Sequence, residues 1–147
     1  MERYQEAVGQ RIRAQAKELF DSEAIDLFIG FEAGTVPLKS RPYFITAEEA
    51  ASDGATIEKL VWDSFCSNNL AAYLQRYYEN EPNRRKKREA PYTRVGIAVK
   101  GCDCRSVVAL VKERQVVREA VKLVGVPCAG MIDRRRVLEL VDGEVTE

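Results

Sequence analysis

Apolar positions recur at helical spacing over residues 2–21 of the chain. Val8, Ile12, Leu19 and Phe20 stand there among Arg, Lys, Glu and Gln residues. A stripe of this kind is typical of an amphipathic helix that packs one face against a core. The pattern therefore predicts a helix over 2–21.

Continuous apolar runs farther along the chain predict strands. These runs cover residues 24–34, 43–45, 94–101 and 121–130, with a loop at 37–41 between the first two. The first of these runs, 24–34, lacks strict alternation of apolar and polar residues and closes in glycine, which indicates a buried strand. The intervening segments are less regular: residues 57–65 fit a strand or a helix, and residues 79–91 predict a polar loop.

Residues that favour helix starts lie between these runs. The predicted starts are a capping box of Thr46 with Glu49, a cap at Ser67 or Asn68, a cap at Asp103 and a cap at Asp133. The expected core positions are Leu70, Leu74 and Tyr77 in the helix that starts at Ser67 or Asn68. In the helix that starts at Asp103 they are Val107, Leu110 and Val111. The helix that starts at Asp103 is expected to end at about Gln115, and the one that starts at Asp133 is expected to end at Leu140.

The order of these elements predicts the fold class. The second half of the chain alternates strand, helix, strand and helix, which favours a parallel sheet with helices packed on it. A length of 147 residues is typical of one domain. We therefore expect a single α/β domain over residues 1–147, with a mostly parallel sheet of about four strands.

Charge and hydropathy narrow the function classes. Lys plus Arg and Asp plus Glu number 23 each, which argues against a nucleic-acid or membrane surface spread over the whole chain. The basic run at 83–88 has acidic neighbours and no interleaved aromatic residue. It predicts a solvated loop or a docking patch for an acidic redox partner. With no signal-peptide core and no apolar run of membrane length, we expect a cytoplasmic protein.

Cysteines carry the candidate chemistry. The chain has no His and has four cysteines, Cys66, Cys102, Cys104 and Cys128. In the cytoplasm, spaced cysteines indicate metal binding or catalysis more often than disulfides. Without His, any metal ligands must be mainly thiolates.

The cysteines are placed next to predicted strand ends and helix starts. Cys102 and Cys104 follow one predicted strand, Cys128 follows the next, and Cys66 precedes a helix. Because parallel strands end at one sheet edge, at least three thiols are expected there. Helix N-termini offer N–H donors that suit an anionic iron–sulfur cluster. The spacing contains no CxxC motif, so small cysteines that only pack in a core fit it equally well.

Four short motifs carry a resemblance to a known family. They are KGCD-R at 100–105, E-x-Q-V-x-R-E at 113–119, G-V-P-C-x-G at 125–130 and W-x(3)-C-x-x-N-L-A at 62–71. With these motifs the chain resembles the beta subunit of coenzyme F-420-reducing hydrogenase. Its relatives include iron–sulfur subunits linked to formate dehydrogenase and heterodisulfide reductase. The resemblance covers most of residues 10–140.

The resemblance implies an electron-transfer subunit or domain of an anaerobic oxidoreductase complex. It implies a 4Fe–4S cluster, FAD in the full complex, and flavin or ferredoxin-like subunits as partners. Cys66, Cys102 and Cys128 match family cysteine positions, and Cys104 stands where relatives often carry another residue. The candidate cofactor contacts around them are Lys100, Gly101, Asp103, Arg105 and Asn69.

Other interpretations of these residues stay open. Asp103 and Asn69 also fit helix caps, and Lys100 and Arg105 also fit solvated surface charges. At the level of the whole chain, one alternative is a non-enzymatic scaffold module with zinc or free thiols. Another is a thiol redox protein in which Cys102 and Cys104 form a reversible disulfide.

Overall fold

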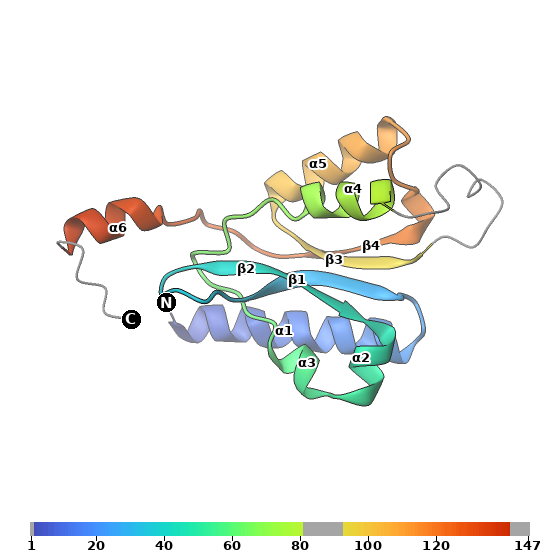
Figure 1. Ribbon diagram of the computed structural model, residues 1–147, viewed down its shortest axis with the longest axis horizontal. Coiled ribbons are helices and arrows are strands. Elements are labelled where there is room, and N and C mark those ends of the chain that lie inside the picture. The colour runs from blue at the N-terminus through green and yellow to red at the C-terminus, as the bar shows by residue number, and fades with distance from the viewer. Residues whose placement is uncertain (1, 81–92, 142–147) are drawn as a thin grey trace.

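A four-stranded sheet forms the centre of the molecule (Figure 1). The computed structural model describes residues 2–80 and 93–141. The strands are β1 (Leu27–Ala33), β2 (Ser40–Thr46), β3 (Val95–Val99) and β4 (Val121–Gly125), in the spatial order β2-β1-β3-β4. Strands β1, β3 and β4 are parallel, and β2 pairs antiparallel with β1. The predicted α/β class, with a mostly parallel sheet of about four strands, is confirmed.

Helices cover both faces of the sheet. Figure 1 shows α1 (Glu2–Asp21), α2 (Ala47–Ser52) and α3 (Ala55–Glu58) on one face, and α4 (Ala71–Asn80) and α5 (Gly101–Lys112) on the other. A short 3₁₀ turn, η1 (Arg118–Ala120), leads into β4, and α6 (Arg134–Leu140) extends beyond the end of the sheet. No helix in the described ranges is long and apolar enough to cross a membrane.

The first helix has the amphipathic face that the sequence predicts. Val8, Ile12 and Ala16 are buried, while Leu19 and Phe20 are partly buried against the core. These positions recur at intervals of three or four residues and so lie on one side of the helix. Burial of this apolar stripe holds α1 against the sheet, since isolated helices gain little stability from propensity alone.

The central strands are buried on both faces, and glycine makes room for an aromatic ring. A Cβ atom on Gly96 would lie 2.8 Å from Phe28 Cδ2 and 2.9 Å from Ile25 Cδ1. Both neighbours are among the most deeply buried residues of the core. They therefore have little freedom to move away from an added methyl group.

Several predicted boundaries differ from the observed ones at β2. The loop expected at 37–41 is wrong for its last two residues, because β2 already begins at Ser40. The hairpin closes early, with the Gly34 N–H donating to Lys39 O at 2.7 Å. Pro42 is accommodated because β2 is an edge strand, where a missing ladder donor is tolerated.

Two helix starts also differ from prediction, and two are confirmed. Helix α4 begins at Ala71, and the side chain of Asn69, rather than Ser67 or Asn68, accepts the Ala71 N–H at 3.0 Å. Helix α5 begins at Gly101, so Asp103 lies within its first turn and not at the cap. The Thr46–Glu49 capping box and the Asp133 cap are both present.

Two other predicted segments gave different outcomes. Residues 57–65 contain the end of α3 and otherwise no helix or strand. The loop expected at 79–91 is wrong for residues 79 and 80, which belong to α4, and its other residues, including the basic run at 83–88, lie outside the described residues.

We predict that Gly96→Ala destabilises the protein by about 1–3 kcal/mol, because the added methyl overpacks the core. Gly125→Ala on the neighbouring strand is the matched control, since no atom lies within 4 Å of the Cβ position there. Urea unfolding of both variants measures the free energies. Equal stability of the two variants would contradict the overpacking argument.

Candidate functional site

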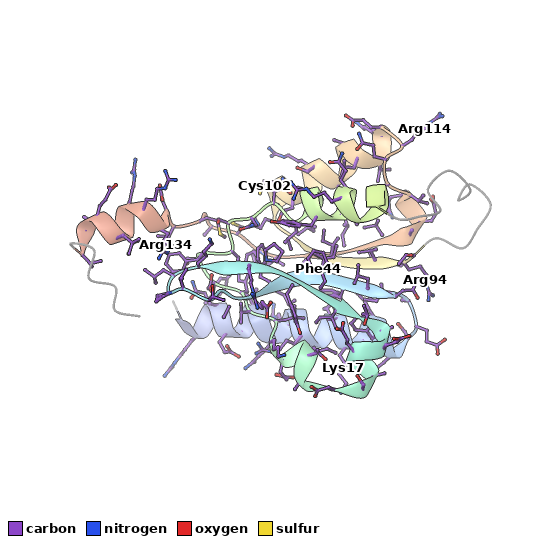
Figure 2. The ribbon with its side chains drawn as sticks, in the orientation of Figure 1. Lys17, Phe44, Arg94, Cys102, Arg114 and Arg134 are labelled. Carbon is purple, nitrogen blue, oxygen red and sulfur yellow. The ribbon has the colours of Figure 1, made fainter. Side chains whose placement is uncertain are left out.

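The carboxyl ends of the parallel strands bring two cysteine turns together. Val99 at the end of β3 pairs in register with Gly125 at the end of β4, and the Val126 N–H donates to Val99 O at 2.9 Å. Cys102 and Cys128 each follow this register pair by three residues. Figure 2 shows Cys102 and Arg134 toward this end of the sheet, with Arg94 at the opposite end. In α/β sheets, ligands bind at this edge.

Lys100, the residue between β3 and α5, points into the protein. Its side chain is only 2% exposed. The Nζ atom donates to the backbone oxygens of Cys66 at 3.0 Å and Asn68 at 2.8 Å. It also lies 3.0 Å from Asp103 Oδ2. Lys100 is therefore a buried structural cation and does not present its charge to a ligand.

Aromatic rings complete the surroundings of this ammonium group. Lys100 Nζ lies 4.9 Å from the centre of the Phe31 ring and 5.9 Å from that of the Trp62 ring. The two rings meet edge to face, with centroids 6.0 Å apart. The negative faces of such rings attract a cation and partly replace the water that burial removes.

Asp103 is the counter-ion and is fully buried. Besides the ion pair with Lys100, its Oδ2 accepts the backbone N–H of Lys100 at 3.1 Å. It thereby satisfies a donor at the start of α5, which is the role of the third residue in a capping box. Asp103 is therefore not the cap residue itself, but as the third residue of the helix its carboxylate holds the start of α5 in place.

Cys66 is fully enclosed in the loop before α4. Its Sγ accepts the Asp63 N–H at 3.4 Å, and the thiol donates to Asp63 Oδ1 at 3.5 Å. Burial raises the pKa of the Cys66 thiol to about 12, partly offset by its hydrogen bonds to Ser40 and the Asp63 backbone. The thiol is consequently neutral at physiological pH, whereas metal binding needs the thiolate.

The other three cysteines differ in their exposure and in their neighbours. Cys102 and Cys128 are exposed, while Cys104 is partly buried against the core. Two residues apart on α5, Cys102 and Cys104 point about 200° apart around the helix axis. A disulfide needs facing Cβ atoms, so this helix disfavours a reversible Cys102–Cys104 bridge.

A four-cysteine cluster does not fit this arrangement of the chain. Within residues 2–80 and 93–141, no group of three or more Cys, Asp, Glu or His side chains lies close enough to hold a metal ion. Cys66 points into its own loop, and Cys104 into the core. Only Cys102 and Cys128 offer exposed sulfur at the shared edge.

The remaining predicted contacts divide between the interior and the surface. Asn69 accepts the Ala71 N–H, and its Nδ2 donates to Ser106 Oγ at 3.0 Å, so it joins α4 to α5. Gly101 and Arg105 are exposed beside Cys102. Of the five predicted cofactor contacts, only Arg105 has a side chain that is exposed and forms no hydrogen bond among the described residues.

Asp63 is an important residue that sequence reasoning missed. Its Oδ1 accepts the Phe65 N–H at 2.7 Å and so forms the turn that encloses Cys66. The Ile132 N–H donates to the neighbouring Ser64 O at 2.9 Å, which joins this turn to the segment after Cys128. The available signal was Asp followed by Ser, because Asp side chains commonly bond the backbone two residues ahead.

Comparisons with known proteins do not identify the chain. No protein-family model matches the sequence, and no curated protein matches it significantly. The resemblance to hydrogenase beta subunits therefore stays a prediction that rests on the motifs alone.

We predict that Lys100→Met destabilises the protein by about 3–5 kcal/mol, because it leaves the Asp103 carboxylate buried without a counter-ion. The double variant Lys100→Met/Asp103→Leu should regain part of this loss, as double-mutant cycles show for coupled pairs. Urea unfolding measures both.

Asp26→Asn, which breaks the exposed pair of Asp26 with Arg94 at 2.7 Å, is the control and should cost about 1 kcal/mol or less. Similar losses for the buried and the exposed pair would contradict the assignment.

We predict that Cys66 makes folding stability decrease with pH above about 9. The folded thiol keeps its proton until a pKa of about 12, whereas the unfolded thiol ionises near 9. The advantage of the wild type over Cys66→Ala should therefore shrink by ~1 kcal/mol per pH unit between these two pKa values. Urea unfolding at a series of pH values measures it, and parallel stability curves would contradict the burial of a neutral thiol.

Proposed function

We propose that the chain is an electron-transfer subunit or domain of a cytoplasmic oxidoreductase complex. In this proposal, Cys102 and Cys128 are two thiolate ligands of an iron–sulfur cluster, and a partner subunit supplies the remaining ligands. The observation that carries the proposal is the placement of these two exposed thiols after an in-register pair on adjacent parallel strands.

The surroundings of Cys102 support a role toward an anionic group. Cys102 lies in the first turn of α5, where backbone N–H groups lack helical acceptors and favour negative charge. Hydrogen-bond donors near cluster sulfurs adjust cluster potentials. Arg105, exposed one turn later, adds a positive charge near the same edge.

A metal-free scaffold module is the second candidate, and a specific observation favours it. Among the described residues, no buried side-chain N or O atom lacks a hydrogen-bond partner. Lys100 and Asp103 satisfy each other, and Cys66 is bonded within its loop. None of these buried groups is left aimed at a ligand. A module that only organises other subunits needs no more than this.

Anaerobic reconstitution of the full chain with iron and sulfide separates the two candidates. A small thiol is included to occupy the positions that a partner subunit would fill. We predict broad absorbance near ~400 nm and bound iron in the wild type. Cys102→Ser and Cys128→Ser should each lose most of this iron, whereas Cys66→Ala should keep it, with the fold of each variant checked by circular dichroism.

Other results would reject the electron-transfer proposal. Colourless, iron-free protein would favour the metal-free scaffold, and one zinc with no iron would favour a scaffold module that holds zinc. Iron that persists in both serine variants would place the cluster elsewhere than on Cys102 and Cys128.

A further inference from the structure

Among residues 2–80 and 93–141, no strand pairs with the outer edge of β4. This strand pairs with β3 on one side only, since the strand order ends at β4. The Val126 N–H points toward β3, where it donates to Val99 O. Backbone groups alternate in direction along a strand, so the N–H and C=O groups of Leu123 and Gly125 point to the open side. They form a template on which another strand can pair.

The two edges of the sheet are protected differently. Each edge strand carries one basic residue, Arg41 in β2 and Lys122 in β4, but β2 also carries Pro42, which has no backbone N–H to donate to a further strand. The five residues of β4 contain no proline. Lys122 is the only charged residue in β4, and Leu123 beside it is 42% exposed. The outer edge of β4 is therefore the more accessible one for an added strand.

A groove runs beside this edge, between β4 and α1. Its volume is about 320 Å³. Val8, Ile12, Val124 and Val126 contribute apolar lining, and Arg11 and Gln15 contribute polar lining. A strand added to β4 would place alternate side chains over this groove, because side chains alternate between the faces of a sheet. The groove can thus supply specificity while the edge supplies backbone hydrogen bonds.

Charge around the edge indicates the kind of partner. Arg11 lines the groove, and Arg118, Glu119 and Lys122 lie on η1 and β4, which gives an excess of positive charge. None of the three cations forms an ion pair within the part of the chain that the structure describes. A second copy of the chain would bring the same cations together, which disfavours self-pairing. An acidic strand would neutralise them.

We propose that the β4 edge and its groove bind an extended, acidic segment of a partner protein, which adds a strand to the sheet. The groove ends at Pro127, next to Cys128, but strand pairing on β4 uses neither thiol, so the proposal does not depend on the electron-transfer proposal. Backbone pairing provides part of the affinity, and Arg11, Arg118 and Lys122 select for acidic side chains.

The test uses the full chain and a short blocked peptide of alternating Glu and Val residues. Two control peptides accompany it: one with Lys in place of Glu, and one with N-methylated Val amides, which keeps the charge but cannot pair. Titration should show at least about tenfold tighter binding of the Glu–Val peptide than of either control. Hydrogen exchange should slow at the Leu123 and Gly125 amides when the peptide binds.

A charge-reversal variant checks the site. Lys122→Glu should weaken binding about fivefold, the size expected for one cross-strand charge pair. Lys59→Glu, an exposed lysine beside α3, should leave binding unchanged. No binding, equal binding of the three peptides, or binding without amide protection on β4 would overturn the proposal. Self-association that protects the same amides would overturn it too, and would assign the edge to a second copy.

Discussion

The buried ion pair between Lys100 and Asp103 is the constraint on which the carboxyl edge of the sheet depends. An ammonium group cannot stay charged in a protein interior without close partners. Lys100 has the Asp103 carboxylate, two backbone oxygens in the loop before α4, and the faces of Phe31 and Trp62. To satisfy one charge, the protein must hold the end of β3, the start of α5 and that loop in fixed positions.

This constraint also decides what the edge presents to the outside. Because Lys100 and Asp103 neutralise each other inside, the KGCD motif contributes no net charge to the surface. The positions between and after them, Gly101, Cys102 and Arg105, are exposed. Half of the motif is thus core and half is surface, as the helical period requires for residues at the start of a packed helix. A motif that resembles a cofactor site can therefore serve the fold and still leave one thiol exposed, that of Cys102, which donates to Asp103 Oδ1 at 3.8 Å.

The sequence allows prediction of those features that follow from local pattern. The helix at 2–21, the buried strand within 24–34 and the Asp133 cap depend on apolar spacing and on capping chemistry within a few residues, and the structure confirms them. The strands expected at 94–101 and 121–130 are present but end early, at Val99 and Gly125. The site is harder to predict because it depends on contacts between distant segments. The hydrogen bond from Lys100 to Cys66 O joins residues 34 positions apart. Nothing in the local sequence distinguishes this buried lysine from a solvated one.

The same reasoning explains why four cysteines in similar local sequence settings differ in exposure. Each lies near a helix start, but its exposure depends on what packs over it. The Asp63 turn and Ser40 enclose Cys66, and the inner face of α5 takes Cys104. Cys102 and Cys128 stay exposed because neighbouring parallel strands end in register beneath them, where the sheet itself supplies no cover. Parallel register, rather than cysteine spacing, is therefore what places both thiols beyond the same edge of the sheet.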